Sequence, residues 1–292
     1  MGKGQANSVY ISDLDGTLLR QDATASPYTL EVLQRLLAQG LFFTVASARS
    51  VVAMRKILSG LTLPLPVIEF NGAFISDLAS GRHEIIQDFG LHLAQDIYAF
   101  IRKHHLVPFI STFNGSEDCL YYTSVSNPGM RWYIKDRQQH GDRRLRHNAN
   151  MESVLFERVV CFTIIGRRRD MHNMYLHIQQ AFGKNTVCLC QENTYSPGWF
   201  WVTVHPREAT KAQAIQRLLR AHNLAERELV VFGDNINDLP MFAIADTRIA
   251  VANAVDRVKH AADHIIAAND ADAVARYLQQ VWKRPRNGNH GG

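Results

Sequence analysis

The chain has 292 residues, of which 46% are hydrophobic and 20% charged, and its formal net charge is +5. This composition is typical of a globular protein and excludes a largely disordered one, and the length suffices for one large domain or two modest ones. No apolar run approaches the roughly 18 residues of a membrane span, and no signal peptide precedes the first predicted strand. We therefore expect a cytoplasmic protein whose four cysteines, Cys119, Cys161, Cys188 and Cys190, are reduced thiols.

Short apolar runs alternate with amphipathic segments in the first and last thirds of the chain. Strands are predicted at residues 9–12, 41–46, 67–70, 229–232 and 248–251, and helices at residues 29–38, 50–58, 210–222, 237–245 and 271–282. This alternation of strand and helix favours a parallel sheet with helices on both faces.

The middle third has a different pattern. Helices are predicted at residues 93–104 and 171–182 and strands at 107–112, 120–123, 159–165, 187–191 and 199–204, with an irregular basic stretch after the second strand. Because the strand–helix alternation resumes afterwards, we predict a discontinuous α/β core of residues 1–81 and 205–292, with an α+β domain of residues 82–204 inserted into it. Residues 283–292, rich in Gly, Asn and Arg, are expected to be disordered.

Basic residues crowd the middle third at Arg131–His147 and again at Arg167–Arg169. Such clusters can bind nucleic acid, guide small anionic substrates to a site, or form a solvated face. Neither an aromatic-interleaved nor a zinc-finger pattern accompanies them, so nucleic acid is the weaker interpretation.

The first predicted strand ends in two carboxylates, Asp13 and Asp15, followed by Gly16. Residues i and i+2 of an extended chain point to the same side, so these carboxylates should project together, and Gly16 permits a sharp turn after them. Close carboxylates repel each other unless a cation neutralises them, and Mg²⁺ favours such ligands together with phosphate oxygens. An Asp carboxylate can also act as the nucleophile in phosphoryl transfer. The alternative is a solvated, Asp-rich turn.

Three further segments carry polar groups that a phosphate or metal site would need. Ser47 follows the second strand, where its hydroxyl could hold a phosphate oxygen or cap a helix. Lys211 lies in the first turn of a predicted helix, against the helix dipole, which indicates either a nearby anion or a solvated charge. In the segment Leu229–Asp238, Asp234 and Asp238 follow a buried strand at the position where ligands bind in open α/β sheets, although they could merely start a turn and cap a helix.

In this order and spacing, these motifs resemble those of the haloacid dehalogenase superfamily. The matching segments are Asp13-Leu14-Asp15-Gly16-Thr17-Leu18, Ser47-Ala48-Arg49, the isolated Lys211, and Gly233-Asp234 with Asn237-Asp238. Residues 70–73, 249–254 and 262–263 are similar to those of the Cof-type hydrolases in its phosphatase branch. The resemblance implies a Rossmann-like core with an inserted αββ-repeat cap that governs specificity. It also implies a Mg²⁺-dependent phosphatase of small phosphorylated metabolites, with sugar phosphates as one candidate.

The resemblance further implies a role for each matched residue. Asp13 would be the nucleophile that forms an aspartyl-phosphate, and Asp15 the general acid and then the general base. Mg²⁺ would be held by Asp13, the backbone carbonyl of Asp15 and Asp234, with support from Asp238. The phosphoryl group would be bound by the side chains of Ser47, Lys211 and Asn237 and by the backbone N–H groups of Leu14 and Ala48.

Two other functions remain open. A phosphomutase of hexose phosphates would retain the phosphorylated intermediate and require a bisphosphate activator. A regulatory module would bind phosphoryl groups without turnover, although the intact acidic residues argue against it. Ser47-Ala48-Arg49 stands where the family usually has Thr-Gly-Arg, which keeps the hydroxyl, and Ala273 replaces a customary Gly. The sequence identifies neither the substrate nor the oligomeric state, and it does not decide whether Arg131–His147 contacts substrate.

Overall fold

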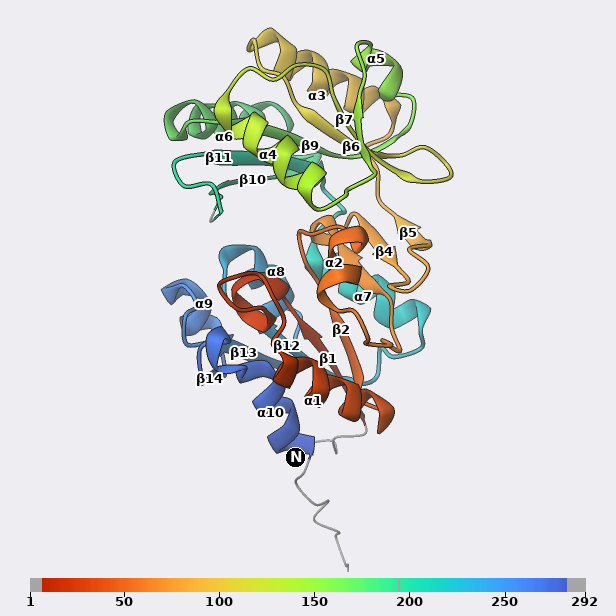
Figure 1. Cartoon of the computed structure of the whole chain (residues 1–292), viewed down its shortest axis with the longest axis vertical. Helices are drawn as coiled ribbons and strands as arrows, with labels where there is room; N and C mark the ends of the chain where they lie inside the picture. The colour runs from red at the N-terminus through yellow and green to blue at the C-terminus, as the bar shows by residue number, and fades with distance from the viewer. Residues whose placement is uncertain (1–6, 194, 283–292) are drawn as a thin grey trace, which may run out of the picture. The chain divides into compact units, whose positions relative to one another are not determined.

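The computed structural model describes residues 7–193 and 195–282, so the predicted disorder of residues 283–292 lies outside the described residues. The chain divides into two compact units, the first formed by the residues up to 85 together with those from 210 onwards, and the second by residues 86–209 (Figure 1). Among the described helices, none has the length and apolar character needed to cross a membrane.

The first unit is built on a parallel sheet with the strand order β14-β13-β12-β1-β2. Its strands are β1 (Ser8–Ser12), β2 (Phe42–Val45), β12 (Glu228–Gly233), β13 (Thr247–Val251) and β14 (His264–Ile266). Its helices are α1 (Pro27–Ala38), α2 (Val51–Ile57), α7 (Lys211–Ala221), α8 (Leu239–Phe242), α9 (Asp256–Ala261) and α10 (Ala273–Trp282). The predicted parallel sheet is confirmed.

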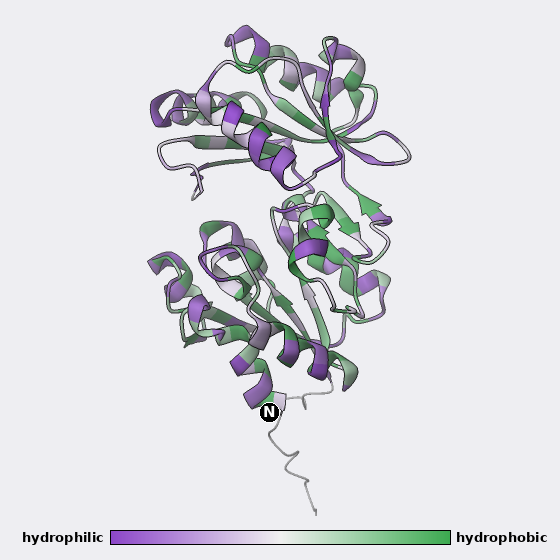
Figure 2. Ribbon diagram, in the orientation of Figure 1, coloured by the Kyte–Doolittle hydropathy of each residue, from purple (hydrophilic) through white to green (hydrophobic). Residues whose placement is uncertain are grey.

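Helices cover both faces of this sheet because its strands are apolar on both sides. In β1, Val9 and Ile11 belong to a buried cluster with α7, α8 and α9, whereas Tyr10 belongs to the opposite cluster with α1 and α10. Figure 2 shows hydrophobic residues concentrated along these strands. Burial on both faces explains the continuous apolar runs in the sequence.

The strand predicted at residues 67–70 does not extend this parallel sheet. It forms β3 (Val67–Glu69), which pairs antiparallel with β4 (Phe74–Ser76) in a three-stranded sheet completed by β5 (His83–Ile86). An isolated parallel bridge joins Ala46, just after β2, to Ile68 in β3. The short helix η3 (Phe70–Gly72) reverses the chain, with Asn71 at a φ of +56°, and so returns it alongside β3.

The second unit has a six-stranded sheet in the order β10-β11-β9-β6-β7-β8, with all described pairs antiparallel except β7–β8. Its strands are β6 (Phe109–Phe113), β7 (Asp118–Tyr122), β8 (Leu145–His147), β9 (Arg158–Gly166), β10 (Thr186–Glu192) and β11 (Phe200–Pro206). Its helices are α3 (Leu91–Lys103), α4 (Pro128–Gln139), α5 (Met151–Val154) and α6 (Arg168–Phe182). A helix–strand–strand order occurs twice, as α3-β6-β7 and α6-β10-β11, which fits the expected α+β domain. All four cysteines are free, as predicted.

The stretch expected to be irregular contains α4 and β8, so that expectation is wrong. The Asn127 side chain accepts a hydrogen bond from the Met130 N–H, and Pro128 occupies the first helical turn, which are favourable start signals. Met130, Tyr133 and Ile134 recur at helical spacing and pack into a buried cluster against the sheet. The surrounding charges concealed this short apolar stripe.

Arginines of the same stretch form ion pairs within the unit, among them Arg144 and Arg146. Arg144 is buried with its Nη2 2.6 Å from Asp142 Oδ2, and Arg146 Nη2 lies 2.8 Å from Glu117 Oε1. These pairs give both side chains a structural role, and the guiding of anionic substrates by the stretch stays a prediction.

Candidate active site

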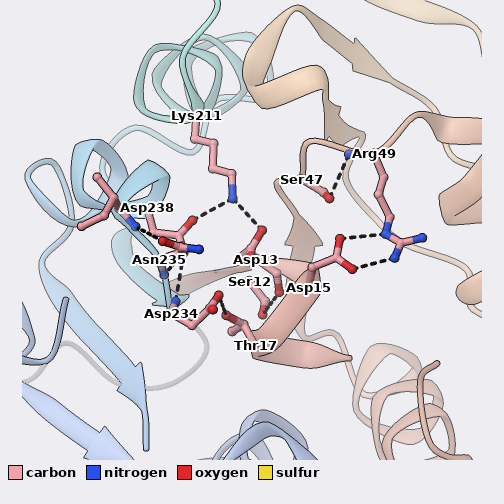
Figure 3. Close-up of polar contacts among 11 residues, drawn as sticks. Ser12, Asp13, Asp15, Thr17, Ser47, Arg49, Lys211, Asp234, Asn235 and Asp238 are labelled. Carbon is pink, nitrogen blue, oxygen red and sulfur yellow. Dashed lines mark hydrogen bonds and ion pairs between the residues drawn. The ribbon is translucent and has the colours of Figure 1, made fainter. Parts of the chain in front are cut away.

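Three strand ends define the candidate site in the first unit. In the sheet register, Ser12 at the end of β1 lies beside Phe232 of β12 and beside Val45 of β2, so the carboxyl ends of the three strands are level. Asp13 follows β1 and Asp234 follows β12, and Ser47 lies just beyond β2 (Figure 3). This edge is where ligands bind in open α/β sheets.

A buried lysine lies between two of the carboxylates. Lys211 is 1% exposed, and its Nζ is 2.6 Å from Asp13 Oδ1 and 2.7 Å from Asp238 Oδ1 (Figure 3). It is the first residue of α7, whose cap Thr210 accepts a hydrogen bond from the Gln213 N–H. The interpretation of Lys211 as a solvated lysine is therefore wrong, and its anionic partners explain a cation at the start of a helix.

Asp238 connects the lysine to the loop after β12. Its Oδ1 accepts from Lys211, while its Oδ2 accepts from the backbone N–H groups of Asp234 and Asn235 at 2.9 and 3.0 Å. Asp238 ends the short helix η4 (Ile236–Asp238), where it completes a capping box with Asn235. The interpretation of Asp238 as a helix-capping residue is thus correct, and its carboxylate also accepts a hydrogen bond from Lys211.

Three carboxylates lie close enough together to hold one cation. Asp13, Asp234 and Asp238 each offer an oxygen within 4.8 Å of the others. Burial raises the pKa of Asp13 well above its usual range, with Lys211 opposing the shift, and burial together with Asp238 raises the pKa of Asp234 to about 6. Burial alone would lower the pKa of Lys211, but Asp13 and Asp238 outweigh it and raise that pKa. Three carboxyl groups face a single ammonium, and the raised pKa values of Asp13 and Asp234 mean that their negative charge is not fully compensated, so this oxygen donor set fits a divalent cation such as Mg²⁺.

The turn after Asp13 is packed closely against Asp234. Gly16 has a φ of +79°, and a Cβ atom there would lie 2.5 Å from Asp234 Oδ2, so glycine is required on both counts. Thr17 donates a hydrogen bond of 2.8 Å to Asp234 Oδ1, and Asn253 donates one of 2.7 Å to the Gly16 carbonyl. Asn269 in turn donates its N–H to the Asn253 side chain at 3.0 Å.

Asp13 and Asp15 do not project together as expected. β1 ends at Ser12, and Asp15 lies in the irregular turn η2 (Leu14–Leu18) with extended backbone angles. Asp13 faces Lys211, whereas Asp15 binds Arg49 through two contacts, Nε–Oδ2 at 2.7 Å and Nη2–Oδ1 at 2.6 Å (Figure 3). The Asp15 carboxylate is thus outside the acidic cluster found among the described residues.

The structure tests one of the two interpretations of Ser47. Its buried hydroxyl accepts the Arg49 N–H at 3.1 Å, while Ser50 is the cap of α2 and accepts the Ala53 N–H. The interpretation of Ser47 as a helix cap is wrong, and its binding of a phosphate oxygen stays a prediction.

The other expected phosphate ligands lie in loops around the same strand ends. Leu14 is buried at the start of η2, Ala48 is exposed beside Ser47, and Asn237 is half-buried in η4. Their binding of phosphate stays a prediction. Thr17, Arg49 and Asn253 form site contacts that sequence reasoning did not assign, although all three lie within the quoted motifs.

An acidic cluster with a buried lysine at the carboxyl ends of a parallel sheet defines a class of α/β enzymes that act on anionic ligands. Comparison with known families gives the more particular assignment. The model of the haloacid dehalogenase-like hydrolases matches residues 10–278 of this sequence. The chain belongs to the haloacid dehalogenase-like hydrolase family, and the predicted family and fold class are confirmed.

Named relatives of the chain are phosphatases. It is 25% identical to the 5-amino-6-(5-phospho-D-ribitylamino)uracil phosphatase YitU of Bacillus subtilis, with 92% of this chain and 96% of the relative covered. It is 24% identical to the pyridoxal phosphate phosphatase YbhA of Escherichia coli, with 91% and 95% covered. A solved structure of a Thermotoga maritima protein superposes with a TM-score of 0.76 at 24% identity, covering 93% of this chain and 96% of that one. The chain is accordingly an enzyme, a phosphatase of the haloacid dehalogenase-like type.

Proposed function

We propose that the chain is a Mg²⁺-dependent phosphatase that hydrolyses a small phosphorylated metabolite in the cytoplasm through an aspartyl-phosphate at Asp13. The observation that carries this proposal is the placement of Asp13. Asp13 is 5% exposed at the end of β1, and its carboxylate is paired with Lys211 and clustered with Asp234 and Asp238. Because these charged groups hold the Asp13 carboxylate in place, it would approach the phosphorus atom of a bound substrate from one fixed direction.

The reaction proceeds in two balanced steps. The Asp13 carboxylate attacks phosphorus, the bond to the ester oxygen breaks, and Asp15 gives its proton to the departing alkoxide. Asp15 then takes a proton from a water molecule that attacks the phosphorus bound to Asp13. The bond between the Asp13 oxygen and phosphorus breaks, inorganic phosphate leaves, and both side chains return to their starting states.

The remaining residues bind and orient the phosphoryl group. Lys211, Ser47 and Asn237 donate from side chains, and Leu14 and Ala48 donate from backbone N–H groups. Most of the rate enhancement in phosphoryl transfer comes from such positioning and charge stabilisation.

The metal ion would be held by Asp13, Asp234 and the backbone carbonyl of Asp15, with Asp238 fixing the loop of Asp234. When bound, Mg²⁺ supplies positive charge to the phosphate oxygens in the transition state. The excess of carboxyl groups over the single ammonium of Lys211 supports this assignment.

The substrate class follows from the relatives. Their names specify phosphorylated small molecules, among them a phosphoribitylamino uracil and pyridoxal phosphate. We assign this chain a small phosphorylated metabolite, with sugar phosphates among the candidates, and the second unit the role of a specificity cap. No nucleic acid or membrane partner is part of the proposal.

Phosphate release from a panel of phosphorylated metabolites tests the proposal. Release should require Mg²⁺, stop with a chelator, and be lost in Asp13→Asn, an isosteric change without a nucleophile. The exposed Asp96→Asn serves as the matched control. Binding without release would indicate a regulatory module. Retention of the phosphoryl group with a bisphosphate requirement would indicate a phosphomutase, and release that persists in Asp13→Asn would contradict the mechanism.

A further inference from the structure

The Asp15–Arg49 ion pair has a well-defined geometry although both side chains are partly exposed. The Asp15 side chain is 40% exposed and that of Arg49 24%, yet both carboxylate oxygens are bound by two different guanidinium nitrogens. A fork of this kind fixes the orientation of the carboxylate as well as its position. An ion pair at this exposure contributes little to stability, so the fork is better explained by the orientation that it imposes on Asp15.

The backbone that carries Arg49 is anchored to the neighbouring turn on both sides. The Ser47 N–H donates to the Ile68 carbonyl and the Asn71 N–H donates to the Ser47 carbonyl, both at 2.9 Å. The Phe70 N–H donates to the carbonyl of Arg49 itself at 3.3 Å. The loop after β2 is therefore held against η3, and the guanidinium extends from a fixed base.

A buried glutamate secures the other end of this loop. Glu69 is 0% exposed and accepts hydrogen bonds from the N–H of Val51, the first residue of α2, and from the Ser76 hydroxyl. With α2 fixed at its start, Arg49 lies between two anchored points. Such a supporting shell is what a precisely oriented catalytic group needs.

We infer that Arg49 is a positioning residue for Asp15, acting on the reaction only through the orientation of that carboxylate. The inference rests on the proposed function, in which Asp15 gives a proton to the leaving group. Replacing Arg49 removes the two contacts that fix the Asp15 carboxylate and so lowers the fraction of complexes in which Asp15 reaches the ester oxygen.

The leaving group supplies the test. An alkyl phosphate needs a proton on its departing oxygen, whereas p-nitrophenyl phosphate releases a stable phenolate without one. We expect Arg49→Met to lower kcat/KM for an alkyl phosphate by about 10- to 100-fold, part of the roughly 10²- to 10⁴-fold range of general acid catalysis. The value for p-nitrophenyl phosphate should change less than threefold or so, and inhibition by inorganic phosphate should be unchanged. Arg49→Lys, which keeps the charge without the fork, should fall in between.

A double-mutant cycle with Asp15→Asn completes the experiment, with the exposed Arg35→Met as the matched control. Arg49→Met should cause no further loss once Asp15 is removed. Equal losses for both esters, weaker phosphate inhibition or additive losses would overturn the inference, because Arg49 would then bind the phosphoryl group itself or act separately. If Asp15→Asn alone left hydrolysis of the alkyl phosphate unchanged, the acid role in the proposed function would fail first and the inference with it.

Discussion

Lys211 shows at the scale of one residue how strongly surroundings determine what a side chain does. A lysine is rarely buried unless it is paired, and this one is 1% exposed with a carboxylate on either side. Without it, Asp13 and Asp238 would face each other with no intervening positive charge. Lys211 thus supplies the positive charge between two buried carboxylates, and in the proposed function it also binds the phosphoryl group.

Replacing Lys211 by Met keeps the length of the side chain and removes its charge. We expect kcat to fall by about 10²- to 10³-fold, the usual effect of removing one preorganised charge from a transition state. The melting temperature should fall as well, because breaking a buried ion pair leaves unpaired charges. Steady-state kinetics and thermal melting check both effects, with exposed Lys103→Met as control. Wild-type kcat in Lys211→Met would contradict its role.

Much of the site could be predicted residue by residue, but its contacts could not. Asp13, Asp234 and Lys211 are recognisable because each lies in a distinctive local motif. The partners Thr17 and Asn253 are recognisable only after folding, since Thr17 meets a residue 217 positions away and Asn253 one 237 positions away. The expectation that Asp13 and Asp15 project together is wrong because the strand ends at Ser12, before both residues, and the chain enters the turn η2 at Leu14.

At the scale of elements, the turn η3 fixes the start of α7. Gly72 has a φ of +115°, and a Cβ atom at this position would lie 2.4 Å from the Thr210 carbonyl oxygen. Thr210 is the cap residue immediately before Lys211. The Asn71-Gly72 turn therefore sets the position of the helix end that carries the buried lysine.

Gly72→Ala should lower the free energy of unfolding by more than the cost of placing alanine at a positive φ. Gly60 has a φ of +87°, and a Cβ atom there would have nothing within 4 Å, so Gly60→Ala measures the conformational cost, which is about 1–2 kcal/mol. Gly72→Ala adds a backbone clash, and overpacking typically costs a further 1–3 kcal/mol or so. Denaturant unfolding should show this difference, and kcat should fall in Gly72→Ala alone. Equal stability losses at the two glycines would contradict the close approach.

Elements with long apolar runs could be predicted from the sequence, whereas elements that mix apolar and charged residues could not. The strands of the parallel sheet are buried on both faces, so their residues are almost all apolar. The helix α4 has only a narrow apolar stripe among charged residues, so its sequence does not show a clear helical periodicity. β3 was recognised as a strand, but its pairing depends on the η3 turn, which no periodicity reveals.

At the scale of the whole molecule, the second unit contains a histidine that links its stability to pH. His205 in β11 is 3% exposed, with Nε2 3.7 Å from Cys161 Sγ, and burial lowers its pKa from 6.5 to about 4. The unfolded chain therefore binds a proton at a pH where the folded chain does not. This contribution makes folding less favourable as the pH falls from about 6.5 to about 4, and has no effect above that range.

Between pH 7 and pH 5 this histidine should reduce the free energy of unfolding by about 2 kcal/mol. Denaturant unfolding of the wild type and of His205→Gln at both pH values isolates the effect, because other titrating groups are common to both proteins. The variant should lose less stability on acidification than the wild type. An equal loss in the two proteins would show that His205 is not the group responsible.

The central claim is that Asp13 carries the phosphoryl group during turnover, and trapping that intermediate tests it most directly. The enzyme is mixed with Mg²⁺ and an active phosphate ester, quenched in acid within the first turnover, and digested for peptide mass analysis. The account predicts one phosphoryl group on the peptide containing Asp13, which borohydride reduction converts to homoserine at that position, and none in Asp13→Asn. Rapid phosphate release with Asp13 unmodified throughout, or a phosphoryl group on a different residue, would contradict it.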